Sequence, residues 1–176
     1  KKAKKVNVTY LINDAYMNIG NNFSYLKNER KSIDYYNKIK YEKDNLNLII
    51  SLKANIASSY INLGEYEKAF SIIKDVVDKP EYMRQKRKGI GVINSLLGLY
   101  YLKTKRPLYS WFYLKRANNI FKSIEASNGE NYNQIYFSEY YAQINDTLNA
   151  IKTAQKAVVL SRNYKNPLDI LMSLEQ

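Results

Sequence analysis

The sequence predicts an all-α protein built from about four helix–turn–helix repeats, followed by the start of a fifth. Two observations support this fold class. The 176 residues include only six Gly and three Pro, which is few for a fold of short strands and tight turns. Small and bulky residues also recur in fixed columns, at steps of 37, 41 and 40 residues. A repeated period of this length indicates stacked helical repeats.

The columns are clearest where the two helices of one repeat would cross. The first helix has a small residue at Gly20, Ala57, Gly98 and Ser138. An aromatic residue follows three positions later, at Phe23, Tyr60, Tyr101 and Tyr141. The second helix has a small residue at Ser32, Ala69, Ser110 and Ala150. Two further columns follow it, at Tyr36, Ile73, Leu114 and Ala154, and at Ile39, Val76, Ala117 and Ala157.

Residues 56–69 resemble the tetratricopeptide (TPR) repeat. They contain an apolar residue and then small Ala57, Tyr60 three positions later, a turn at Gly64, an acidic–Tyr pair, and Ala69. The resemblance implies a right-handed α-solenoid whose small residues let paired helices pack closely. Lys27, Lys105 and Asn145 replace the usual turn Gly elsewhere, and the period exceeds the usual value of about 34 residues.

Periodicity, turns and caps together place eight helices. Asn145 and Asp146 can accept bonds from the free amides that begin the last helix. Pro80, Pro107 and Pro167 each precede an apolar run, as expected for Pro in a first helical turn. The expected ranges are about 8–27, 29–42, 46–63, 65–78, 81–104, 107–127, 131–143 and 146–163.

These helices predict a single solenoid domain over residues 1–176. Its repeats cover about 8–44, 45–80, 81–127 and 131–165, and residues 167–176 begin a further helix. Each helix pair buries its apolar stripe only against its neighbours. An array that stopped here would leave Ala150 and Ala154 partly bare, so we expect the chain to be a fragment of a longer protein.

The composition argues against catalysis. There are no Cys and no His residues, which removes thiolate metal sites, disulfides and the commonest general base. We therefore expect no enzyme, no metal, no cofactor and no small-molecule substrate. No run approaches the roughly 20 apolar residues that span a bilayer, and the compartment, periplasmic or cytoplasmic in a bacterium, stays open.

In TPR proteins the first helices line a concave face that binds a partner. The resemblance therefore implies that a protein or peptide contacts Asn18, Asn21, Tyr25, Asn55, Ser58, Asn62, Ser95, Leu99, Lys103, Tyr132, Ile135, Tyr136 and Glu139. Side-chain amides carry the donor and acceptor that an extended peptide backbone needs, and Tyr and apolar residues supply pockets. The alternative is a set of solvated helix faces in an Asn-rich chain.

The formal net charge of +12 is concentrated in the third repeat. Residues 79–116 contain ten basic residues and one acidic residue. The candidate anion patch consists of Arg84, Arg87, Lys88, Lys105 and Arg106. Such a patch would attract nucleic acid, an acidic protein segment or anionic lipid. A solvated Lys-rich surface is the alternative, and no nucleic-acid-binding motif accompanies the patch.

The function predicted from the sequence is a non-catalytic protein- or peptide-binding module. Residues 154–161 and 166–168 resemble TPR arrays of bacterial signalling regulators, which implies a sensor or interaction domain. The first alternative is a cytoplasmic peptide-pheromone-type regulator. The second is a scaffold that binds nucleic acid or another polyanion through the basic third repeat. A homodimer also stays open.

Overall fold

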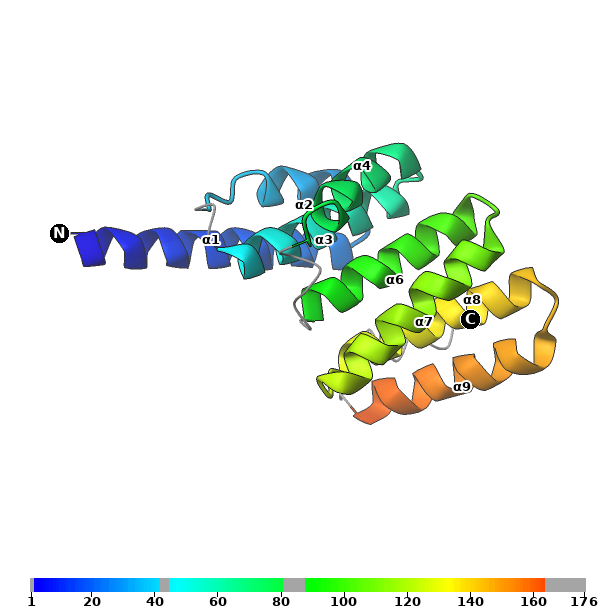
Figure 1. Ribbon diagram of the computed structural model, residues 1–176. Coiled ribbons are helices and arrows are strands. Elements are labelled where there is room, and N and C mark those ends of the chain that lie inside the picture. Colours follow the sequence, from blue (N-terminus) through cyan, green and yellow to red (C-terminus); the bar gives the residue numbers. More distant parts are fainter. Residues whose placement is uncertain (1, 42–44, 81–87, 164–176) are drawn as a thin grey trace. The chain divides into compact units, whose positions relative to one another are not determined.

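Helical hairpins make up the fold. The computed structural model describes residues 2–41, 45–80 and 88–163, and the regular elements in these ranges are all α-helices (Figure 1). They fall into two compact units, Lys1–Tyr82 and Met83–Gln176, each with two hairpins. This architecture confirms the predicted all-α, TPR-like class. None of the described helices combines the length and apolar character needed to cross a membrane.

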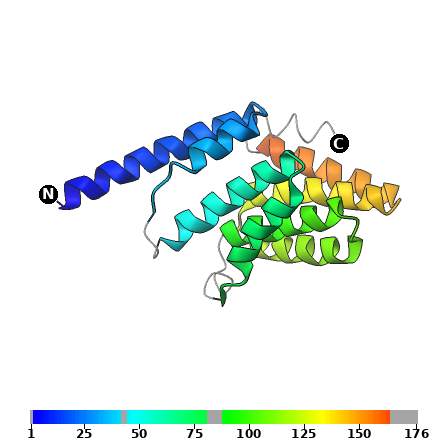
Figure 2. The same ribbon diagram turned by 90° about the horizontal axis from the view of Figure 1, so that it is seen from above.

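The first unit contains helices α1 (Lys2–Tyr25), α2 (Glu29–Tyr36), α3 (Leu46–Asn62) and α4 (Tyr66–Val77). Helix α1 pairs with α2, α3 pairs with α4, and α2 also packs on α3. In Figure 2, α1 extends well past the end of the shorter α2. Tyr36, Ile39 and Leu52 form a buried cluster between the hairpins, against which Tyr16 and Met17 of α1 pack.

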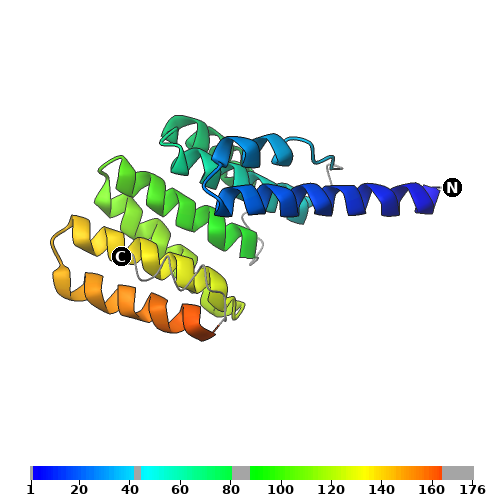
Figure 3. The same cartoon turned by 180° about the vertical axis from the view of Figure 1, so that it is seen from behind.

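The second unit contains helices α6 (Lys88–Lys103), α7 (Pro107–Ser123), α8 (Ser127–Gln143) and α9 (Thr147–Asn163). Helix α7 packs against both α6 and α8, and α8 pairs with α9 (Figure 3). The Phe121 ring of α7 lies against two glycines. A Cβ atom would fall 2.4 Å from this ring at Gly91 and 2.3 Å at Gly129. Both positions therefore require glycine for the close approach.

The predicted columns lie at the helix crossings. The Ser32 hydroxyl donates to the Gly20 carbonyl at 2.8 Å, and the Ser138 hydroxyl donates to the Ala150 carbonyl at 3.1 Å. A Cβ atom at Gly98 would lie 2.5 Å from the Leu114 side chain. The core columns are buried at Tyr36, Ile73, Leu114, Ile39, Val76, Ala117 and Ala157. The small and apolar columns thus form the core of the hairpins, as predicted, whereas the aromatic column is only half-buried, as are two of the small residues; these half-buried positions are Phe23, Tyr60, Tyr101, Tyr141, Ala150 and Ala154.

The four hairpin turns share one backbone geometry. Their turn residues have positive φ, at Lys27 (58°), Gly64 (75°), Lys105 (60°) and Asn145 (62°). The next backbone N–H donates to the carbonyl of the aromatic column, as from Asn28 to Phe23 at 2.8 Å and from Glu65 to Tyr60 at 2.9 Å. This is the Schellman pattern that satisfies the last carbonyls of a helix. The turn therefore persists where glycine is replaced.

Some helix ends differ from the prediction. Helix α1 begins at Lys2 rather than about residue 8, and α2 ends at Tyr36 rather than about residue 42. The early end of α2 follows from Asn13 of α1. Its side chain accepts from the Lys40 N–H at 2.9 Å and donates to the Lys40 carbonyl, so this backbone pairs with α1 rather than continuing the helix.

The joint between α7 and α8 also differs. Helix α7 ends at Ser123 rather than about residue 127, because Glu125 takes a φ of 52° and the Ala126 N–H closes the turn on the Phe121 carbonyl at 2.9 Å. Helix α8 then begins at Ser127 rather than about residue 131. The expected helix start near residue 81 and the further helix at residues 167–176 lie outside the described residues.

Candidate functional site

Two predicted asparagines lie together between α1 and α3. Asn55 Nδ2 donates to Asn21 Oδ1 at 3.1 Å and approaches Met17 Sδ at 3.3 Å. The Tyr36 hydroxyl donates to the same Asn21 oxygen at 2.8 Å. Burial raises the pKa of Tyr36, so the hydroxyl keeps its proton and remains a donor. The pair is therefore held in a fixed orientation by the protein itself.

The side-chain amides of Asn21 and Asn55 each keep one polar atom that can bond to a ligand. Within the residues that the structure describes, Asn21 Nδ2 and Asn55 Oδ1 make no hydrogen bond. Both side chains are half-buried, between the fully solvated and the core positions of their helices. The pair thus presents one donor and one acceptor, which is the combination that an extended backbone requires.

The other candidates of the first unit divide into engaged and exposed residues. Asn62 Nδ2 donates to Glu29 Oε1 at 2.7 Å, and the Ser24 hydroxyl donates to Glu29 Oε2 at 3.1 Å. Glu29 is only 5% exposed, so the Asn62 amide is needed to satisfy a buried carboxylate. Asn18 and Tyr25 are exposed, and Ser58 is half-buried.

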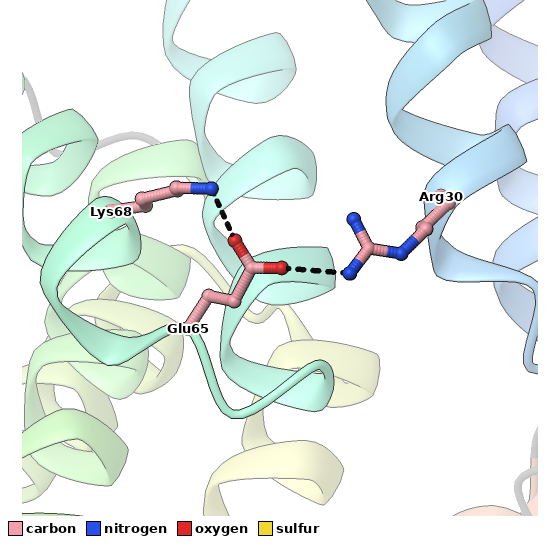
Figure 4. A network of polar contacts seen from close by, with 3 residues as sticks. All are labelled: Arg30, Glu65 and Lys68. Carbon is pink, nitrogen blue, oxygen red and sulfur yellow. Dashed lines mark hydrogen bonds and ion pairs between the residues drawn. The ribbon is translucent and has the colours of Figure 1, made fainter.

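An ion-pair network joins the same two hairpins (Figure 4). Glu65, in the α3–α4 turn, lies 2.6 Å from Lys68 Nζ and 3.2 Å from Arg30 Nη2 of α2. The hydrogen bond from Lys68 holds the pKa of the Glu65 carboxyl below its ordinary value, and the positive charge of Arg30 lowers it further. This network links α2 to the start of α4, and its Glu65 carboxylate is already paired with two cations.

In the second unit, three of the predicted residues are buried. The Ser95 hydroxyl donates to Asn133 Oδ1 at 2.8 Å, and Asn133 Nδ2 donates to the Leu114 carbonyl at 3.0 Å. Leu99 and Ile135 are core residues, 5% and 4% exposed. These side chains hold α6, α7 and α8 together, so the solvent-accessible part of this face lies elsewhere.

The solvent-accessible part of the candidate face in the second unit contains an ion pair and two tyrosines. Lys103 Nζ of α6 lies 2.8 Å from Glu139 Oε2 of α8. Burial, together with the nearby Glu139 carboxylate, raises the pKa of Tyr136 to about 12. Tyr136 is therefore protonated at neutral pH, and Tyr132, one turn away, is half-buried like it. The structure brings these four predicted residues onto α6 and the facing helix α8.

The candidate anion patch is described only in part. Lys88, Lys105 and Arg106 are exposed. Arg84 and Arg87 lie outside the described residues. No group of three or more acidic side chains suited to a metal ion occurs within the described ranges.

Sequence reasoning missed the buried polar residues that position these sites, namely Asn13, Glu29 and Asn133. Glu29 could have been found, because it directly follows Asn28, whose side chain caps α2 by accepting from the Lys31 N–H. For α6, the nearly unbroken apolar run around Ser95 was a signal of burial on all sides. Asn13 and Asn133 leave no comparable signal.

Hairpins of this kind define a helical-repeat protein. The family model described as tetratricopeptide repeat matches residues 50–78, which cover most of α3 and all of α4. No curated protein sequence matches the chain. Residues 50–78 thus form a tetratricopeptide repeat, and the other described hairpins have the same helix–turn–helix architecture. Such repeats are generally non-catalytic modules that mediate protein–protein interaction.

Proposed function

We propose that this protein binds an extended segment of a partner protein along α1 and α3, with Asn21 and Asn55 reading the partner's backbone. The observation that carries the proposal is the half-satisfied amide pair. Asn21 Oδ1 and Asn55 Nδ2 bond within the protein, which leaves Asn21 Nδ2 and Asn55 Oδ1 for a ligand.

The pair suits a peptide in the extended conformation. Asn21 Nδ2 would donate to a backbone carbonyl, and Asn55 Oδ1 would accept from a backbone N–H. Because Tyr36 and Met17 already hold the two amides in place, little side-chain freedom is lost on binding, and such preorganisation favours affinity. Exposed Asn18 and Tyr25 on α1 would contact side chains of the same segment.

In the second unit, the corresponding proposal rests on Lys103, Glu139, Tyr132 and Tyr136. A partner with a charged side chain would exchange it into the partly exposed Lys103–Glu139 pair. The protonated Tyr136 hydroxyl supplies a donor beside the pair. This second face adds specificity for side chains, whereas the amide pair reads the backbone.

An immobilised array of random peptides tests the amide pair. Asn55→Ala should weaken binding of the selected peptides roughly tenfold, since it removes one ligand bond and unfixes Asn21, and each net hydrogen bond contributes about 0.5–1.5 kcal/mol. Asn22→Ala is the matched control, because Asn22 is an exposed asparagine of the same helix as Asn21 that does not belong to the candidate residues. An equal loss of peptide affinity in both variants, or no loss in Asn55→Ala, would show that the amide pair does not contact the peptide.

We further propose that the chain is the sensor or interaction domain of a bacterial signalling regulator. The resemblance of residues 154–161 to such arrays supports this role. Sequencing the flanking gene tests it: a following membrane helix and kinase or helix-turn-helix domain is the expected result. A helix-turn-helix domain without a membrane helix would instead favour the cytoplasmic peptide-pheromone type. A flanking gene sequence that encodes no output domain of either kind would contradict both roles.

A further inference from the structure

The outward columns of the second helices differ sharply between the two units. Two positions before the small residue of each second helix, the first unit has Arg30 and Glu67, whereas the second has Leu108 and Leu148. At the column four residues later, Asp34 and Ser71 are replaced by Phe112 and Lys152. Leu108 is 83% exposed and Leu148 is 79% exposed. At three of these four positions the second unit therefore has a large apolar side chain where the first unit has a polar one.

On α7 these side chains form one face. Leu108, Trp111, Phe112 and Lys115 follow the i, i+3, i+4, i+7 spacing that places residues on one side of a helix. Trp111 and Phe112 are 42% and 53% exposed. Lys115 Nζ lies 6.0 Å from the centre of the Trp111 ring. We call Leu108, Trp111 and Phe112 the α7 apolar face.

The charge around this face has a single sign. Helix α7 contains three cations and no Asp or Glu, and α9 has the same composition. In contrast, α2 and α4 each contain both acidic and basic residues in equal number. Lys105 and Arg106 add two exposed cations directly before α7. Within α7 and the two residues before it, the charged side chains are therefore all positive.

We propose that the α7 apolar face docks on the surface of an anionic lipid membrane. A helix that lies in the membrane interface buries Trp, Phe and Leu about 5–10 Å deep while Lys and Arg contact anionic headgroups. Leu108, Trp111 and Phe112 supply the first group, and Lys105, Arg106, Lys115 and Arg116 supply the second. Lys and Arg stems are long enough to reach the headgroups while their apolar neighbours insert.

Other occupants fit this surface less well. In a twofold contact between copies, the same patch meets itself, so the cations of α7 would face one another with no acidic residue on that helix to offset them. Single-stranded nucleic acid would stack on Trp111 and Phe112, but it gives no role to Leu108, the most exposed of the three. An anionic bilayer accommodates both the aliphatic and the aromatic side chains.

The chain provides its own reporter, because Trp111 is its single tryptophan. Its emission is measured with vesicles of phosphatidylcholine alone and of equal parts phosphatidylcholine and phosphatidylglycerol, together with flotation of the protein. The expected result is a blue shift and flotation with the phosphatidylglycerol vesicles. No shift and no flotation with these vesicles would overturn the proposal.

Variants separate the apolar and the charged contributions. Leu108→Ser/Phe112→Ser should lower the partition coefficient at least tenfold, because the burial of two large apolar side chains is lost. Lys115→Gln and Arg116→Gln should each lower it about fivefold on the anionic vesicles. Leu26→Ser is the matched control, since Leu26 is a 75% exposed leucine in the α1–α2 turn, and it should leave partitioning unchanged.

Two results would identify another occupant. If Leu26→Ser and Leu108→Ser/Phe112→Ser bind vesicles alike, the α7 apolar face does not insert. If poly-uridylate or polyglutamate shifts the Trp111 emission and the anionic vesicles do not, the surface recognises a polyanion in solution rather than a membrane. Helical circular dichroism of every variant confirms that the exposed substitutions leave the fold intact.

Discussion

At the scale of single residues, one polar side chain often serves two helices. Asn21 Oδ1 accepts from both Tyr36 and Asn55, and Glu29 accepts from both Ser24 and Asn62. Buried polar groups must be hydrogen-bonded to be tolerated. The asparagines of the first unit therefore specify how its hairpins fit, and only the amide ends that remain unbonded are open to a ligand.

The turn residues give a test at this scale. Lys105 has a φ of 60°, a conformation that costs a non-glycine residue about 1–2 kcal/mol. Lys105→Gly removes this cost and adds about 0.4–1 kcal/mol of unfolded-state entropy. We therefore expect a net gain of up to about 1 kcal/mol in the free energy of unfolding, measured by urea titration with circular dichroism.

The paired controls for Lys105→Gly are a helical lysine and the native turn glycine. Lys122→Gly, in the last turn of α7, should destabilise the protein by about 0.5–1 kcal/mol, because glycine is a poor helix former. Gly64→Ala should also destabilise, since Gly64 has a φ of 75°. A loss of stability in Lys105→Gly would show that the turn tolerates lysine without strain.

At the scale of the elements, the hairpin joints are fixed by different chemistry in the two units. In the first unit, Arg30, Glu65 and Lys68 connect α2 to the α3–α4 turn. In the second, the Phe121 ring and the Ser95–Asn133 bond connect α6, α7 and α8. Charge contributes to the first joint, so its stability depends on pH.

The Glu65 carboxyl gives the sign of that dependence. Its pKa is lowered from 4.5 in the folded protein, first by the Lys68 hydrogen bond. A lowered carboxyl pKa contributes stability above the unfolded-state value, and this contribution is lost as pH falls through the folded-state value. Between pH 7 and pH 3, Glu65→Gln should therefore lose less stability than the native chain, measured by urea midpoints at both pH values. Equal losses would show that Glu65 contributes nothing to the joint.

At the scale of the whole molecule, we propose that residues 1–176 unfold as one solenoid domain. In repeat proteins, neighbouring repeats stabilise one another through their interfaces. The test uses a substitution in one unit and a reporter in the other. Gly20→Leu overpacks the first unit, since even a Cβ atom at Gly20 would lie 2.4 Å from the Tyr36 ring.

We expect Gly20→Leu to lower the free energy of unfolding by about 1–3 kcal/mol, as is typical of overpacking. In a single domain, the urea midpoint reported by Trp111 fluorescence should fall together with the midpoint reported by circular dichroism. An unchanged Trp111 midpoint beside a lowered circular dichroism midpoint would instead show two independently folding units.

The sequence predicted the hairpins because their core depends on local periodicity. Gly20, Ser32 and Tyr36 are identifiable by spacing alone, since helix packing repeats small and bulky residues in register. Asn13 was not identifiable, because its bond to the Lys40 backbone joins residues 27 positions apart outside any column. Asn21 and Asn55 are half-buried at the helix positions that the family resemblance implied, so solvent reaches them. Ser95 instead lies in a helix that is buried on nearly all sides, where a family position does not imply solvent access.

The Phe121 ring between Gly91 and Gly129 has a mechanical consequence. One aromatic ring packs against glycine positions of both α6 and α8. The size of the ring therefore sets the spacing between the third and fourth hairpins. Pulling these hairpins apart requires the ring to slide out of both contacts. Under a stretching force, the third and fourth hairpins should therefore separate abruptly rather than gradually, because both contacts of the Phe121 ring are lost together.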